Sequence, residues 1–172
     1  MKNLILVFLI FIVFGCSSEN DISTDAREKL DVVDQYIKTI EKKDIDRMKE
    51  LLAEDFISYG PGFKTEVTKA HNITDWEKSW EERIVSMKYK RVYIGLISIE
   101  KGKLAGEWVT EWGEVTTLYK DGKTVKFWFN GLYKVADGKI MEARVVFDNM
   151  DILNQLGYKF MPPTDIIDES GH

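Results

Sequence analysis

The sequence predicts a single α+β domain in which helices come first and an antiparallel sheet follows. With 172 residues, 44% of them apolar, the chain is long enough for one globular core. Near the N-terminus, Leu30, Val33, Ile37 and Ile40 recur at the spacing of one buried helix face. From Tyr89 onward, turn signals divide the chain into four strands; they are Lys101-Gly102, Asp121-Gly122 and Asp137-Gly138.

Glycines inside the predicted strands indicate bulges or bends, so we expect a bent sheet. They are Gly95, Gly106, Gly113 and Gly131. Before the sheet, one helix is predicted from Asp25 to Glu41, and Asp44 can cap a second helix over 45–52. A strand over 56–59 should end at Gly60-Pro61-Gly62.

A third helix is predicted over 75–87, after a loop over 63–73. Thr74 followed by Glu77 fits a capping box at its start. Its apolar stripe can pack in the core or, in the functional interpretation, wall a cavity. The stripe consists of Trp76, Trp80, Ile84 and Met87.

The stretch over 131–157 reads as strand, Asp137-Gly138 turn, strand and short closing helix. Alternation in its second strand places two sets of side chains on opposite faces. One face carries Ile140, Glu142, Arg144, Val146 and Asp148, and the other carries Met141, Ala143, Val145 and Phe147. Either face could be the inner one.

This stretch resembles the C-terminal signature of SnoaL-like proteins, which belong to the nuclear transport factor 2-like superfamily. The resemblance rests on Gly138-Lys139-Ile140, on Glu142, Arg144 and Asp148 after it, and on the closing Gln155-Leu156-Gly157. Residues 30–60 resemble the opening helices and first strand of that superfamily, so the resemblance covers about 30–158.

The resemblance implies a cone-shaped domain over 25–160, in which an antiparallel-rich sheet carries about three helices on its concave face. A short C-terminal helix would close one end of the cone. It also implies a homodimer that pairs through the convex sheet face. The superfamily contains cyclases, isomerases, dehydratases, hydrolases and non-enzymatic binding domains, so the resemblance alone names no substrate.

The N-terminus predicts a bacterial lipoprotein. Lys2 precedes the apolar run Leu4–Phe14, which is too short for a stable membrane span and fits a signal peptide over 1–15. Val13-Phe14-Gly15-Cys16 resembles a lipobox, so Cys16 is the expected lipidation site. We expect a polar tether over 16–24, a flexible acidic tail over 161–172, and a location at the bacterial cell envelope, or secretion if Cys16 is not lipidated.

Composition argues against several classes of partner. The formal charge of −5 and the lack of a basic run argue against nucleic acid and leave the lipid anchor as the expected membrane contact. A single cysteine and two histidines give no internal disulfide and no Cys-based zinc site. We expect no metal and no cofactor.

Asp148 is the sharpest candidate for chemistry. In SnoaL-like cyclases an aspartate in this region acts as acid or base, and the resemblance implies that role here. The apolar residues before Asp148 favour partial desolvation, which makes a carboxylate a better proton acceptor. The alternative is that Asp148 caps the helix beginning near Asn149.

Two further residues could assist Asp148. Tyr59 could donate a hydrogen bond to a developing oxyanion, as tyrosines do in steroid isomerases of the superfamily, or it could be a core tyrosine. Arg144 could anchor a carboxylate or carbonyl in the cavity, or form an ion pair or dimer contact with Glu142, two residues away.

Aromatic residues are abundant, at 12% of the chain, and could converge on one apolar cavity. Dispersal through the core and a dimer interface is the alternative. The candidate ligand-binding residues are Phe56, Trp76, Trp80, Trp108, Trp112, Trp128 and Asn130.

Three classes of function fit these features. The first is an envelope-tethered module that binds a small apolar or carbonyl-containing molecule. The second is a cyclase, isomerase or dehydratase that uses Asp148 with Tyr59 or Arg144. The third is a protein-interaction domain whose aromatic residues form an interface.

Overall fold

The computed structural model describes residues 23–159. The elements follow one another as α1 (Thr24–Lys42), α2 (Ile45–Leu51), β1 (Leu52–Tyr59), β2 (Glu66–Thr68), α3 (Lys69–Glu82), β3 (Ile84–Ile99), β4 (Gly106–Tyr119), β5 (Thr124–Ala136), β6 (Lys139–Phe147) and α4 (Asn149–Gln155). The predicted signal peptide, the lipidation site Cys16 and the acidic tail over 161–172 lie outside the described residues. Within 23–159, no helix has the length and apolarity to cross a membrane.

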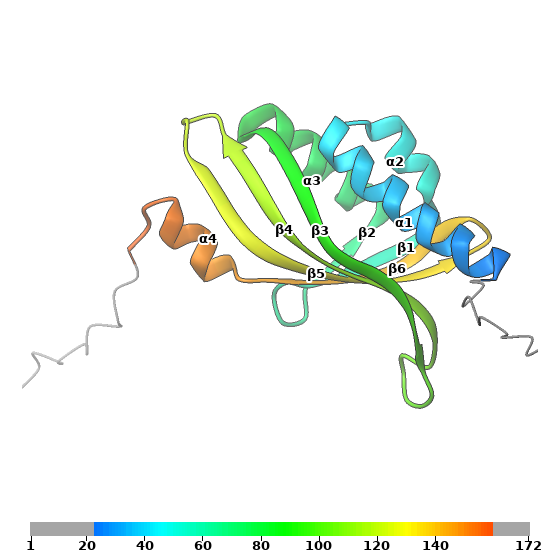
Figure 1. Cartoon of the computed structure of the whole chain (residues 1–172). Helices are drawn as coiled ribbons and strands as arrows, with labels where there is room; N and C mark the ends of the chain where they lie inside the picture. The colour runs from blue at the N-terminus through cyan, green and yellow to red at the C-terminus, as the bar shows by residue number, and fades with distance from the viewer. Residues whose placement is uncertain (1–22, 160–172) are drawn as a thin grey trace, which may run out of the picture.

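The six strands form one bent sheet in the order β2-β1-β6-β5-β4-β3. All neighbouring strands pair antiparallel except β1 and β6, which are parallel. Helices α1, α2 and α3 cover the concave face, whereas α4 follows β6 at the edge of the cone (Figure 1). The predicted fold class, α+β with a bent antiparallel-rich sheet and about three helices on the concave face, is confirmed.

The N-terminal elements form where local signals place them. The Asp44 side chain caps α2 by accepting a hydrogen bond from the Arg47 N–H at 3.0 Å. Val33, Ile37 and Ile40 of α1 are buried against the sheet. β1 begins at Leu52, earlier than the predicted strand start, because the chain passes directly from α2 into the sheet.

The predicted start of the third helix is wrong. α3 begins at Lys69, and Thr68 is the N-cap whose side chain accepts the His71 N–H. Thr74 therefore lies inside the helix, and part of the predicted loop over 63–73 is β2 and the first turn of α3. Buried Ile73 extends the helix beyond the local capping signal, since tertiary packing stabilises the added turn.

The predicted end of that helix is also wrong, because Ile84 and Met87 belong to β3. The register shifts between Ile84, which pairs with Tyr119, and Ser86, which pairs with Leu118. Such a bulge adds one residue to a strand. Ile84 and Met87 are consequently both buried although they are three positions apart in the chain, a spacing that mimics a helix.

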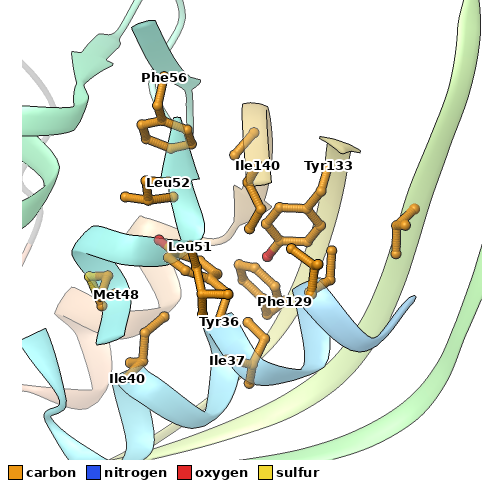
Figure 2. Packing of buried hydrophobic residues seen from close by; sticks show 14 of the residues in the cluster. Tyr36, Ile37, Ile40, Met48, Leu51, Leu52, Phe56, Phe129, Tyr133 and Ile140 are labelled. Atoms are coloured by element: carbon orange, nitrogen blue, oxygen red, sulfur yellow. The ribbon is translucent and has the colours of Figure 1, made fainter. Parts of the chain in front are cut away.

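The core lies between α1, α2 and the concave face of the sheet (Figure 2). Figure 2 shows Tyr36 of α1 close to Tyr133 of β5, and their ring centroids are 6.2 Å apart in an edge-on contact. A Cβ added to Gly131 would lie 2.6 Å from the Tyr133 ring. Glycine at position 131 therefore provides the space in which this buried ring lies.

Candidate functional site

Strand register settles which face of β6 is the inner one. Ala143, Val145 and Phe147 pair with Tyr133, Gly131 and Phe129 of β5, on the face that the helices cover. Glu142 and Arg144 alternate with them and lie on the convex face. The inner face of β6 is therefore apolar.

Helix α4 is attached where β6 ends and β5 continues. β6 pairs with β5 only from Phe129 onward, which leaves the first residues of β5 without that partner. The Gln155 side chain fills this gap: its Nε2 donates to the Lys126 carbonyl at 2.7 Å, and its Oε1 accepts the Lys126 N–H at 3.0 Å. In addition, Lys123 Nζ donates to the Leu156 carbonyl at 2.6 Å.

Asp148 occupies the N-cap of α4. Its Oδ1 accepts a hydrogen bond from the Asp151 N–H at 3.0 Å, and the side chain is exposed. Asp148 lies four positions beyond Arg144 in extended chain, so their Cα atoms lie roughly 13 Å apart. The structure thus places Asp148 in a capping position and does not bring it into hydrogen-bond reach of Arg144.

Tyr59 and Arg144 contact each other on the convex face. They are register partners of β1 and β6, and the Arg144 guanidinium lies 4.3 Å from the centre of the Tyr59 ring. Arg144 also forms an ion pair with Glu142 at 2.7 Å. Both side chains therefore belong to a surface cluster rather than to the inside of the cone.

The inside of the cone opens between α3 and α4. We call this opening the concave hollow; it has a volume of about 640 Å³. Apolar side chains form its walls, namely Trp76, Ile84, Met87, Phe127, Phe147, Ile152, Leu153 and Leu156. Polar side chains form its rim; they include Ser79, Glu82, Arg83, Tyr119, Lys120, Asp121 and Lys123.

Arg83 is the cation of the rim that is available to a ligand. Lys120 Nζ donates to the Glu81 carbonyl, and Lys123 Nζ contacts both the Leu156 carbonyl and Asp121. Arg83 donates to Ser79 Oγ at 2.8 Å, and within residues 23–159 no carboxylate forms an ion pair with it. Burial raises the pKa of nearby Tyr119, although the Arg83 charge opposes this, so the hydroxyl stays a neutral donor.

The candidate ligand-binding residues do not converge on one cavity. Trp76 lines the concave hollow, and Trp80 stacks against it with ring centroids 5.5 Å apart. Phe56 is buried in the core. Trp108 is also buried, where its indole N–H donates to the Leu104 carbonyl at 2.8 Å.

The remaining three candidates line a second depression on the convex face, which we call the convex hollow. It has a volume of about 670 Å³ and lies between the sheet and the start of α4. Trp112, Trp128 and Asn130 contribute to it, together with Asp148. The Asn130 side chain donates to the Glu111 carbonyl at 2.9 Å.

Sequence reasoning missed Glu111, a buried carboxyl group that is only 3% exposed. Tyr133 donates to its Oε1 at 3.2 Å, and Arg91 contacts its Oε2 at 3.2 Å. Arg91 also pairs with Asp34 of α1 at 2.5 Å. Burial raises the pKa of Glu111 above its ordinary value, and this effect exceeds the opposing effects of Arg91 and Tyr133.

The sequence pattern around Glu111 indicates that its side chain lies on the buried face of its strand. Val109, Glu111, Gly113 and Val115 alternate along β4, so the carboxyl group shares a face with two buried valines. The Glu111 side chain borders a cavity of about 200 Å³ under α1, which Asp34, Tyr89 and Arg91 also line. Across 23–159, no group of three or more His, Cys, Asp or Glu side chains has the arrangement of a metal site.

Comparison with known proteins assigns the family. The family model described as SnoaL-like polyketide cyclase matches residues 30–156. The chain therefore belongs to the SnoaL-like family, as the resemblance in the sequence indicated. A search of curated protein sequences gives no significant match.

Solved structures share the fold. An LEH-like epoxide hydrolase from M. tuberculosis is 20% identical, with a TM-score of 0.62 over 77% of this chain and 91% of that chain. IdmH from Streptomyces antibioticus is 17% identical, with a TM-score of 0.58 over 74% of this chain and 97% of that chain. A nuclear transport factor 2-like protein from Burkholderia pseudomallei is 13% identical, with a TM-score of 0.60 over 76% of this chain and 98% of that chain. At these identities the likeness shows the fold alone.

The raised pKa of Glu111 gives a testable pH dependence. The folded protein binds the Glu111 proton more tightly than the unfolded chain, so this residue's contribution to stability is present below the ordinary value of 4.5. That contribution is lost as pH rises through the raised pKa. Urea unfolding should therefore show wild type losing stability relative to Glu111→Gln as pH rises above 4.5. If the stability of wild type and of Glu111→Gln changed with pH in parallel, the raised pKa of Glu111 would be contradicted.

Proposed function

We propose that the concave hollow binds a small, mainly apolar molecule that carries a carbonyl or carboxylate group. One observation carries this proposal: Arg83, a cation without a carboxylate partner among residues 23–159, borders a cavity whose walls are apolar. Apolar walls with few polar groups are typical of small-molecule sites. A guanidinium at the rim is suited to bind a carboxylate, because its N–H groups can donate two parallel hydrogen bonds to the carboxylate oxygens.

Binding without catalysis is favoured over catalysis in this hollow. The wall that β6 provides is the apolar Phe147, and Asp148 lies beyond it at the N-cap of α4. The carboxylates of the rim, Glu82 and Asp121, are exposed to solvent. Among the lining residues that the structure describes, the hollow therefore lacks a desolvated acid or base facing the position of a ligand.

Two dyes with the same aromatic skeleton test the role of Arg83. Anilinonaphthalene sulfonate carries an anionic group, whereas N-phenylnaphthylamine is neutral. Arg83→Gln should weaken binding of the sulfonate roughly five- to tenfold, because a charge-assisted hydrogen bond is lost, and should leave binding of the neutral dye nearly unchanged. Dye fluorescence titration measures both affinities.

Matched variants locate the binding. Lys88→Gln makes the same charge change on β3 outside the hollow and should leave both affinities unchanged. Leu153→Trp should block both dyes by filling the hollow, whereas Asn154→Trp, on a residue outside the lining, should not. Equal dye binding by Leu153→Trp and Asn154→Trp, at matched melting temperatures, would overturn the proposal.

Acid/base catalysis is a second candidate, favoured by the buried carboxyl group of Glu111. A raised pKa brings a carboxyl group closer to the range in which it can exchange protons near neutral pH. Tyr133 and Arg91 could stabilise negative charge that develops beside it. The cavity of about 200 Å³ at Glu111 would admit only a small reacting group.

An enolisation assay distinguishes this candidate from binding alone. Exchange of the α-protons of the apolar ketone alpha-tetralone for deuterium can be followed by NMR. If Glu111 is catalytic, wild type accelerates exchange, Glu111→Gln does not, and Asp148→Asn retains the acceleration. Acceleration that is lost in Asp148→Asn and kept in Glu111→Gln would instead identify Asp148 as the base.

The lipid tether through Cys16, the location at the cell envelope and the homodimer stay predictions. Cys16 lies outside the described residues, and the structure contains one copy of the chain. With a tether, the concave hollow would take up its ligand at the cell envelope. This location does not affect the dye experiments, because both hollows lie within residues 23–159.

A further inference from the structure

The convex hollow presents two tryptophan side chains to solvent. Trp112 is 40% exposed and Trp128 is 57% exposed, and Val146 beside them is 65% exposed. Large apolar side chains that gather in a depression, rather than singly on a surface, indicate a binding site. The helices that cover the sheet lie on the opposite face, so none of them shields this depression (Figure 1).

The two indole rings form an aromatic corner. Trp112 pairs with Asn130 and Trp128 pairs with Glu114, so the two tryptophans are diagonal neighbours on adjacent strands. Their ring centroids are 6.3 Å apart, and their planes are tilted by 54°. Because the planes are neither stacked nor coplanar, one ligand group can touch both rings.

The charged residues around this corner are mainly acidic. Glu114, Asp148 and Asp151 line the convex hollow, and Lys126 is the cation among its lining residues, which gives a formal charge of −2. The Lys126 ammonium lies 3.7 Å from Glu114, and the two side chains are 65% and 33% exposed. Such an exposed pair is weak, so a ligand cation can displace it at little cost.

We propose that the convex hollow binds a small organic cation that carries a methylated ammonium group. Indole is the best aromatic partner for such a cation, because the faces of the ring carry partial negative charge. The three carboxylates add long-range attraction without needing direct contact. This proposal is independent of the ligand of the concave hollow, whose rim is suited to an anion.

The same charges disfavour the other occupants of an apolar sheet face. A two-fold contact centred on this hollow would bring its carboxylates close to those of the second copy, so the predicted homodimer would pair through another part of the convex face. Anionic lipid head groups would be repelled in the same way. Charge complementarity therefore selects a cation.

Choline and its neutral isostere dimethylbutanol test the proposal directly, because they differ only in nitrogen against carbon. Proton–nitrogen NMR spectra of the full chain would follow the tryptophan indole N–H signals. Choline should shift the signals of Trp112 and Trp128 with a dissociation constant in the millimolar range, and dimethylbutanol should bind at least fivefold more weakly. Titration with potassium chloride gives the control for ionic strength.

Three variants separate cation–π binding from apolar contact. Trp128→Leu keeps an apolar side chain without a π face and should weaken choline binding roughly two- to fivefold, whereas Trp128→Phe should retain most of it. Lys126→Gln removes a competing cation and should strengthen binding at least twofold. Melting temperatures would confirm that these surface variants fold.

Several outcomes would overturn the proposal. They are equal shifts with choline and dimethylbutanol, equal choline binding by Trp128→Leu and Trp128→Phe, and no choline-dependent shift at Trp112 or Trp128. A concentration-dependent dimer that Trp128→Leu converts to monomer, with choline having no effect on either form, would show that a second copy occupies the hollow instead. Analytical ultracentrifugation measures this last outcome.

Discussion

The arrangement of both hollows depends on two hydrogen bonds between the Gln155 side chain and the Lys126 backbone. β6 ends at Phe147 while β5 continues, and an unpaired stretch of strand backbone is costly unless its N–H and C=O groups find partners. Gln155 supplies both partners from one amide, which fixes α4 beside β5. One side of α4 then completes the concave hollow with Ile152 and Leu153, and its start borders the convex hollow with Asp148 and Asp151.

Much of the fold followed from local sequence patterns, because turns and helix caps are short-range features. The turn at Asp137-Gly138 has positive φ at both residues, as the hairpin prediction requires. The boundaries of α3 could not be predicted from these local patterns. Thr74 is a genuine capping signal that tertiary packing overrides, and the bulge after Ile84 gives strand residues a helical spacing. Both errors arise where long-range contacts decide between two locally acceptable structures.

The candidate site was less predictable than the fold, because the inner face of a bent sheet is set by strand register. Alternation in β6 defined two faces correctly from Glu142 onward, but it wrongly put Ile140 on the face of Glu142 and Arg144, because a register shift opposite Lys134 and Val135 turns Ile140 into the core. Only pairing with β5 shows that Val145 and Phe147 face inward. The same register separates Trp76, inside the cone, from Trp112 and Trp128 on its outside. Counting aromatic residues could not show this division, and Glu111 was overlooked between the more conspicuous tryptophans on either side of it.

The central claim is that the tryptophans belong to two separate hollows that prefer ligands of opposite charge. Tryptophan indole NMR signals, recorded while anilinonaphthalene sulfonate is added, test this claim most directly. We predict that the signal of Trp76 shifts with that of stacked Trp80, while the signals of Trp112 and Trp128 stay in place. Shifts at Trp112 and Trp128 with no change at Trp76 would contradict the account.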